Sequence, residues 1–218
     1  MQRGRTRFPC SICELQIMRN TITIKTVLTG CLFLFLLASS GCNPNRPSLK
    51  TVTFDINEAF IGATVTDTVA GITFAPPTNW DTAHDSLLTR VRDAESKETS
   101  TTPIKFTTSS MYYEQQKGGM LVISKLSLNG YTEKKVIEAY ENNIKKSFAG
   151  RELHSEHYKK DSLELYQYTV STQDVVLLKL LLINRNKQVI QMDYFMPKEN
   201  MSVYLDQVES SIGTLKLL

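Results

Sequence analysis

This 218-residue sequence contains three histidines, the residues that most often bind a metal or transfer a proton near neutral pH. His154 and His157 are the one close pair, and their spacing would place both imidazoles on one face of a helix. The residues around them predict a strand instead, on which positions i and i+3 point to opposite faces. His84 stands between Asp81 and Asp85, two acids that suit the start of a helix. We therefore expect no metal site and no cofactor.

The hydroxyl-rich stretch Thr107 to Ser110 could supply a nucleophile only beside an activating base. No histidine lies near it in the sequence, and alternating hydroxyls suit the polar face of a strand. The sequence also lacks the G-x-S-x-G, H-E-x-x-H, phosphate-loop and dinucleotide-binding patterns. We therefore expect a protein that is not an enzyme, with a hydrolase as the weakest of the alternatives.

The cysteines fall in or next to the N-terminal segment. Cys10 and Cys13 have a redox or metal spacing, but no second pair and no surrounding domain accompany them. The longest apolar run, Val27 to Ala38, is shorter than the roughly 20 residues that a membrane-spanning helix needs. It has the length of a secretory signal core, and the small residues that a cleavage site requires follow it before Cys42.

This segment resembles a bacterial lipoprotein signal peptide, which ends in small residues and an obligatory cysteine, here Ser40-Gly41-Cys42. The resemblance implies a signal peptide over residues 1–41, with lipidation of Cys42, and a tether over residues 42–50. Because Met18 and Arg19 already begin a complete basic region, translation from Met18 is an alternative start. Asn43 follows the cysteine, where the enterobacterial retention signal has Asp. We therefore expect an outer-membrane anchor facing the periplasm.

The basic charge belongs to this segment. Residues 1–41 carry a formal charge of +4, and the remaining residues carry −1. Nucleic-acid binding requires a basic footprint on the folded domain, so the charge distribution argues against it. We expect the membrane and an envelope protein as partners.

Residues 51–218 are expected to form one domain of alternating strands and amphipathic helices. Apolar periodicity, turn residues and caps predict these elements. The expected helices cover residues 81–97, 132–148 and 199–211, the last with Met201, Leu205, Val208 and Ile212 inward. The expected strands cover residues 71–74, 104–113, 120–128, 153–158, 163–172, 175–183, 189–195 and 215–218, with weaker strand signals over 51–70.

The strand over residues 175–183 is apolar on both faces, which predicts a central strand covered on both sides. If Ile183 pairs with Val189 of the returning strand, Lys179 faces Asp193. A slip of one residue would place the Asp193 carboxylate opposite a leucine, which is costly in a buried strand. The sequence therefore predicts the first register, with Lys179 and Asp193 as a structural pair.

Two stretches resemble the PsbP-like (Mog/PsbP) superfamily, which includes extrinsic photosystem II proteins. They are Gly71-Ile72-Thr73-Phe74-Ala75-Pro76-Pro77-Thr78-Asn79-Trp80 and the ending Val208 to Lys216. The resemblance implies an α+β fold in which an antiparallel sheet is flanked by helices on both faces, an α/β/α sandwich. It also implies a binding or assembly module, because no catalytic set is common to the family.

Aromatic residues are enriched at recognition surfaces. Trp80, Tyr112, Tyr113 and Tyr131 are therefore the candidates for a partner or ligand surface. Our hypothesis is a membrane-anchored envelope lipoprotein whose domain binds a partner without catalysis. The alternative is a carrier that holds a small apolar or lipid ligand between the sheet and a helix layer.

Overall fold

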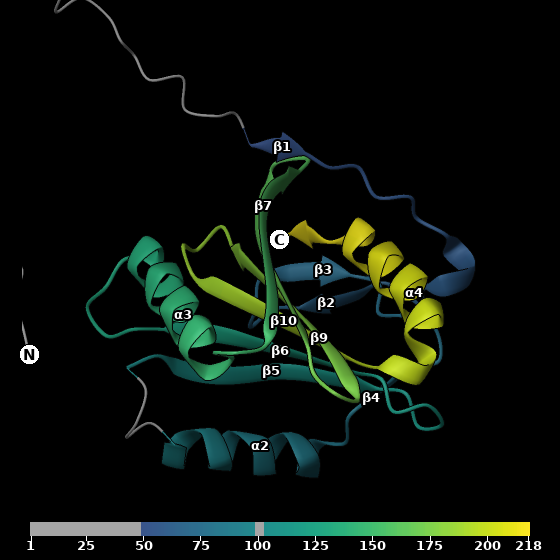
Figure 1. Cartoon of the computed structure of the whole chain (residues 1–218), viewed down its shortest axis with the longest axis horizontal. Helices are drawn as coiled ribbons and strands as arrows, with labels where there is room; N and C mark the ends of the chain where they lie inside the picture. Colours follow the sequence, from purple (N-terminus) through teal and green to yellow (C-terminus); the bar gives the residue numbers. More distant parts are fainter. Residues whose placement is uncertain (1–48, 99–102) are drawn as a thin grey trace, which may run out of the picture. The chain divides into compact units, whose positions relative to one another are not determined.

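An eight-stranded sheet forms the centre of the computed structural model, which describes residues 49–98 and 103–218 (Figure 1). Neighbouring strands are antiparallel, except that the short first strand runs parallel to its neighbour. From one edge to the other, the strands are β1 (Lys50–Thr51), β7 (Glu152–Lys160), β8 (Leu163–Ser171), β9 (Val175–Ile183), β10 (Val189–Pro197), β6 (Met120–Ser127), β5 (Lys105–Tyr113) and β4 (Asp81–Thr82).

The predicted signal peptide over residues 1–41, including Met18, lies outside the described residues, as does Cys42. The predicted tether over residues 42–50 lies there too, apart from its last two residues. Lys50, which we expected in the tether, is the first residue of β1 and pairs with Tyr158 of β7. The described residues belong to one compact unit.

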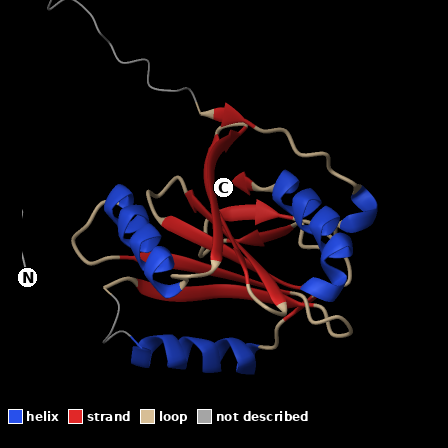
Figure 2. Ribbon diagram, in the orientation of Figure 1, coloured by secondary structure: helices blue, strands red, loops and turns tan. Residues whose placement is uncertain are grey.

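A second, three-stranded sheet has the order β11 (Lys216–Leu217), β3 (Ile72–Phe74) and β2 (Val65–Asp67) within the described residues (Figure 2). The sequence predicted short strands at residues 71–74 and 215–218, but it did not predict that they pair. Lys216 lies opposite Thr73, so the last strand of the chain is joined to one of the first.

The longer helices of the described residues are α2 (Asp85–Glu98), α3 (Glu133–Ser147) and α4 (Met201–Thr214), with 3-10 turns η1 (Glu58–Phe60) and η2 (Lys198–Asn200). The helix expected over residues 81–97 begins later, because Asp81 and Thr82 form β4. The inward stripe of α4 also differs from the expected one: Tyr204 is 1% exposed, and Leu205 is only half-buried. In the part of the chain that the structure describes, no helix has the length and apolarity needed to cross a membrane.

The predicted register of the central hairpin is confirmed. Val189 lies opposite Ile183, and Asp193 lies opposite Lys179. Both faces of β9 are largely covered, as its apolar composition predicted, and Leu180 to Leu182 are fully buried.

The core has one large and two smaller clusters, which use alternate residues of the strands. Ile190, Met192 and Tyr194 of β10 belong to the large cluster, together with α4 and β3. Val189 belongs to the cluster under α3, and a third cluster lies between α2 and β5. The α+β class expected from the sequence is confirmed by this arrangement of strands and helices.

Residues 52–57, here called the N-terminal arm, connect β1 to η1 and pack against α4. The backbone N–H of Asn57 donates to Ser210 Oγ at 3.2 Å. A Cβ atom added to Gly213 would lie 2.7 Å from Cγ1 of Ile56 and 3.1 Å from Cβ of Phe54. The glycine therefore allows the arm to approach the helix closely.

Candidate functional site

The four aromatic residues singled out from the sequence do not share a surface. Trp80 and Tyr112 are each 6% exposed and belong to the large core cluster. Trp80 packs edge-on against Tyr204, with their ring centroids 5.7 Å apart. Tyr113 is half-buried and packs against the cluster beneath α2. Tyr131, which is 60% exposed just before α3, is therefore the one of the four that is open to a partner.

Tyr131 lines a hollow of about 300 Å³ at the end of the main sheet where β5 begins and β6 ends. Three lysines line the same hollow: Lys105 of β5, Lys125 of β6, and Lys187 of the turn between β9 and β10. Among the described residues, no ion-pair partner of these three lysines is found. Glu133 is the acidic residue of the lining. We call this hollow the lysine pocket.

Strand register brings two of the lysines together. Lys105 lies opposite Ser127, and Lys125 lies opposite Thr107. Because residues two apart on a strand share a face, Lys105 and Thr107 occupy neighbouring positions on one side of β5. Strand β6 also pairs with β10, where Lys125 lies opposite Ile190. The turn that precedes β10 therefore lies at the same end of the sheet and supplies the third lysine, Lys187.

The turn that carries Lys187 is held by hydrogen bonds to Asn184. The Lys187 N–H donates to the Asn184 backbone carbonyl at 3.0 Å, and the Gln188 N–H donates to Asn184 Oδ1 at 2.9 Å. This geometry places Lys187 at a φ of 58°. The left-handed region costs a lysine roughly 1–2 kcal/mol, and glycine is the residue that adopts it freely. Asn79 and Asp161 share this conformation, so it is a property of the turns of this fold.

The rest of the lining combines hydroxyl groups with an apolar floor. Thr107 and Ser127 supply hydroxyls, and Leu126, Val136 and Val189 lie at the boundary with the α3 cluster. The titratable residues of the lining are the three lysines, Glu133 and Tyr131. The arrangement can therefore attract and orient an anionic group.

Lys179 and Asp193, the predicted structural pair, form an ion pair on the sheet face that α3 covers. Their side chains are 13% and 9% exposed. Burial raises the pKa of Asp193, and the ammonium of Lys179 and the amide of Gln191 oppose that rise. Burial also raises the pKa of Tyr140, to which the charge of Asp193 contributes. These polar groups lie inside the sheet–helix interface and do not line the lysine pocket.

The hydroxyl-rich stretch of β5 is tied to carboxylates. The Thr108 hydroxyl donates to Glu95 of α2, and the Ser110 hydroxyl donates to Asp67 at 2.8 Å. Arg92 of α2 donates to the Thr108 carbonyl at 2.8 Å, so helix side chains cover this part of the strand edge. These hydrogen bonds give the hydroxyls of Thr108 and Ser110 a structural role.

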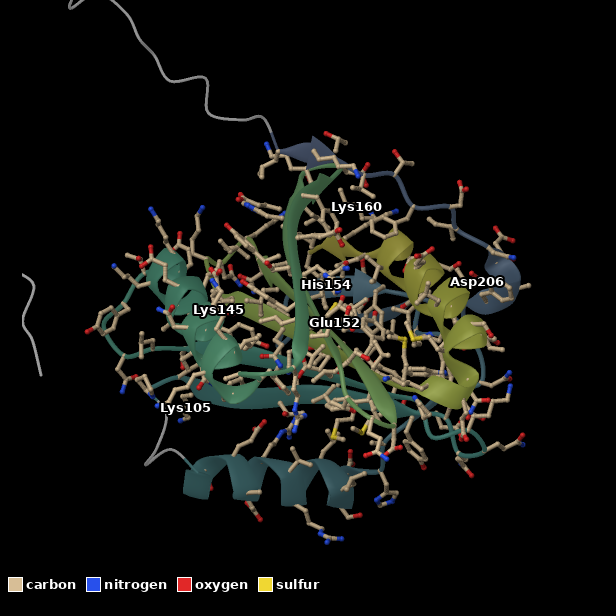
Figure 3. All side chains as sticks on the ribbon, viewed as in Figure 1. Lys105, Lys145, Glu152, His154, Lys160 and Asp206 are labelled. Carbon is tan, nitrogen blue, oxygen red and sulfur yellow. The ribbon has the colours of Figure 1, made fainter. Side chains whose placement is uncertain are left out.

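His84 hydrogen-bonds to the Ser86 hydroxyl at 3.0 Å, and the other two histidines have separate carboxylate partners. His154 pairs with Glu152 at 3.0 Å on the exposed surface of β7, where Figure 3 labels both residues. His157 pairs with Glu164 at 2.7 Å and stacks on Tyr166. Across residues 49–98 and 103–218, no group of three or more His, Cys, Asp or Glu residues is placed to hold a metal ion.

The sequence did not single out the pocket lysines, because they are far apart in the chain and each looks like a solvated charge. One signal was present: Lys125 is the single charged residue of the strand Met120–Ser127, whose other residues are apolar or serine. A charged residue on such a strand must reach solvent or a partner, which indicates a polar hollow at the end of the sheet.

Comparison with known proteins identifies no family. No family model matches the chain, and no curated protein matches it. Among solved structures, the chain is similar to the solution structure of cyanobacterial PsbP (CyanoP) from Synechocystis sp. PCC 6803. The two share 12% sequence identity with a TM-score of 0.45, over 77% of this chain and 98% of that chain. Membership of the PsbP-like superfamily stays a prediction.

Proposed function

We propose that this protein is a membrane-anchored envelope lipoprotein whose folded domain binds a partner without catalysis. The observation that carries the proposal is the lysine pocket, which three lysines without an ion-pair partner among the described residues line together with the exposed Tyr131. An open cationic hollow beside an exposed aromatic ring is suited to recognition, because the charge attracts a ligand and the ring offers contact area.

The fold is well suited to such a module. We infer a PsbP-like α/β/α sandwich, in which α3 and α4 cover opposite faces of the main sheet. The alternation of core residues along β10 supports this inference, since Val189 packs with α3 and Ile190 packs with α4. A rigid sheet would hold the pocket lysines at fixed spacing.

The location is proposed from the sequence. Cleavage before Cys42 and acylation of its thiol would leave a lipid anchor eight residues ahead of β1. Several acyl chains hold a protein stably on a bilayer, because each buried methylene contributes about 0.8 kcal/mol. With Asn43 after the anchor, we propose the periplasmic face of the outer membrane.

Two measurements test the anchor. In bacterial cells that express the full-length chain, the wild type should incorporate radiolabelled palmitate and fractionate with the outer membrane. Cys42→Ser should leave an unlabelled and unprocessed precursor, whereas Cys31→Ser should be processed normally. Normal processing of Cys42→Ser would overturn the proposed lipidation.

The binding role is tested by placing a photo-crosslinking amino acid at Tyr131, with Val203 as the matched exposed position on α4. A specific adduct from the first position, lost when Lys105, Lys125 and Lys187 are all replaced by Gln, is the expected result. Equal adducts from both positions, or an adduct that survives the lysine replacements, would count against the lysine pocket as the binding site.

A carrier of a small apolar ligand is the second candidate. It is favoured by a hollow of about 440 Å³ at the opposite end of the sheet, lined in part by Tyr113, Met120 and Phe195. Native mass spectrometry of the purified protein would show a bound apolar molecule if the carrier hypothesis is right, and the bare polypeptide mass if it is wrong.

A further inference from the structure

We propose that the lysine pocket binds a sugar phosphate, with the phosphomonoester among the three lysines and the sugar ring against Tyr131. This inference deepens the proposed binding function and rests on it. It names the chemical class of the ligand, which the sequence did not reveal.

The charge of the pocket matches a phosphomonoester. The lining carries three lysines and one glutamate, a formal charge of +2. A phosphomonoester carries about −1.5 to −2 at pH 7, whereas a single carboxylate carries −1. Lysine binds phosphate as a point charge, so three lysines that line one hollow suit one dianionic group.

The strands and the turn that carry the three lysines limit the freedom of their backbone. Lys105 and Lys125 project from neighbouring strands in fixed register, and Lys187 comes from a hydrogen-bonded turn. Lysines on a flexible loop would lose more backbone freedom on binding.

The size and polarity of the pocket suit a ligand that is larger than inorganic phosphate and carries hydroxyl groups. A hollow of about 300 Å³ is at the lower end of the range for small-molecule sites and exceeds the space that one phosphate needs. Thr107 and Ser127 supply hydroxyls that can donate to or accept from sugar hydroxyls. Tyr131, at 60% exposure, presents a flat ring with a polar tip at the rim.

The test is isothermal titration of the full-length protein, purified in detergent, with glucose 1-phosphate, glucose and inorganic phosphate. We expect binding of glucose 1-phosphate that weakens as salt is raised, weaker binding of inorganic phosphate, and no measurable binding of glucose. No binding of glucose 1-phosphate would overturn the inference, and equal affinity for inorganic phosphate would overturn the sugar contact.

Removing a positive charge and removing the negative charge should change the affinity in opposite directions. Misfolding would instead weaken binding in every variant, so the two effects are separable. Lys105→Gln, Lys125→Gln and Lys187→Gln should each weaken binding about fivefold, and Glu133→Gln should strengthen it by a similar factor. The control is Lys145→Gln, an exposed lysine of α3 that pairs with Glu141 and is labelled in Figure 3. Equal losses in the control and the pocket variants, or no gain from Glu133→Gln, would overturn the assignment of the site.

The source of the sugar phosphate is resolved with phosphatidylcholine vesicles, prepared with or without a glycolipid that ends in a sugar phosphate. Tighter binding to the glycolipid vesicles than to glucose 1-phosphate would identify a membrane headgroup as the source, and weaker binding would identify a soluble one. Failure of this inference is distinguishable from failure of the proposed function. A protein that ignores sugar phosphates but still forms the lysine-dependent crosslink from Tyr131 would refute the ligand class alone.

Discussion

Lys179 and Asp193 face each other on β9 and β10, and their side chains form a largely buried ion pair between two strands that are otherwise mostly apolar. The pair lies near other buried polar groups. Three oxygen atoms of Tyr140, Gln191 and Asp193 have no hydrogen-bond partner among the described residues. Such a cluster contributes less to stability than its contacts suggest, because the cost of removing charges from water opposes their attraction.

The first prediction concerns this pair. Lys179→Met should lower the free energy of unfolding by about 3–5 kcal/mol, because it leaves the carboxylate of Asp193 buried without its cation. Lys179→Met combined with Asp193→Leu should recover most of that loss, since two packed apolar side chains need no partner. Urea denaturation followed by circular dichroism measures both values. Equal losses in the single and double variants would show that packing, and not charge, sets the effect.

The second prediction concerns alkaline pH. Burial, with a contribution from the charge of Glu141, raises the pKa of Tyr168 to about 12. An exposed tyrosine in the unfolded chain titrates near pH 10. From about pH 10 to 12 the folded protein therefore keeps a phenolic proton that the unfolded chain releases, and the free energy of unfolding should fall as pH rises. Below pH 10 both states keep the proton, and the effect is absent.

Urea denaturation at several pH values, with tyrosinate absorbance at 295 nm, measures this dependence. Tyr168→Phe should reduce the slope of stability against pH above pH 10. An unchanged slope in that variant would contradict the contribution of Tyr168.

The third prediction concerns the strained turn. Lys187→Gly should raise the free energy of unfolding by about 1 kcal/mol relative to Lys187→Gln, because glycine adopts a φ of 58° without steric cost. Both variants lose the same charge, so both should bind a sugar phosphate equally weakly. Thermal unfolding compares their stabilities, and identical stability would show that the turn imposes no strain on residue 187.

The fourth prediction concerns the N-terminal arm. Gly213→Ala should lower the free energy of unfolding by about 1 kcal/mol, because the new methyl group would clash with Ile56 and Phe54 by more than the gain in helix propensity offsets. Amide hydrogen exchange should accelerate in residues 52–57.

Adding Ile56→Ala should relieve this clash, since Ile56 is 49% exposed and its own truncation costs little. If Ile56→Ala is equally destabilising in the wild-type and Gly213→Ala backgrounds, the arm does not pack against α4 as described.

The sequence by itself determined the local elements and the central register. Alternation and apolar runs predicted the long strands, because a strand places every second residue on one face and burial selects the apolar ones. The register of β9 and β10 followed from the cost of placing Asp193 against a leucine. The N-terminal signal and Cys42 remain predictions of the sequence.

Tertiary structure decided which residues are exposed and which distant residues meet. The sequence could not distinguish the buried Trp80 from the exposed Tyr131, since both are large amphipathic side chains and only packing removes one of them from water. It also could not assemble the lysine pocket, because Lys187 meets Lys105 and Lys125 only through the pairing of β6 with β10, which lies about 65 residues further along the chain. Local patterns specify elements, but contacts between those elements create the lysine pocket.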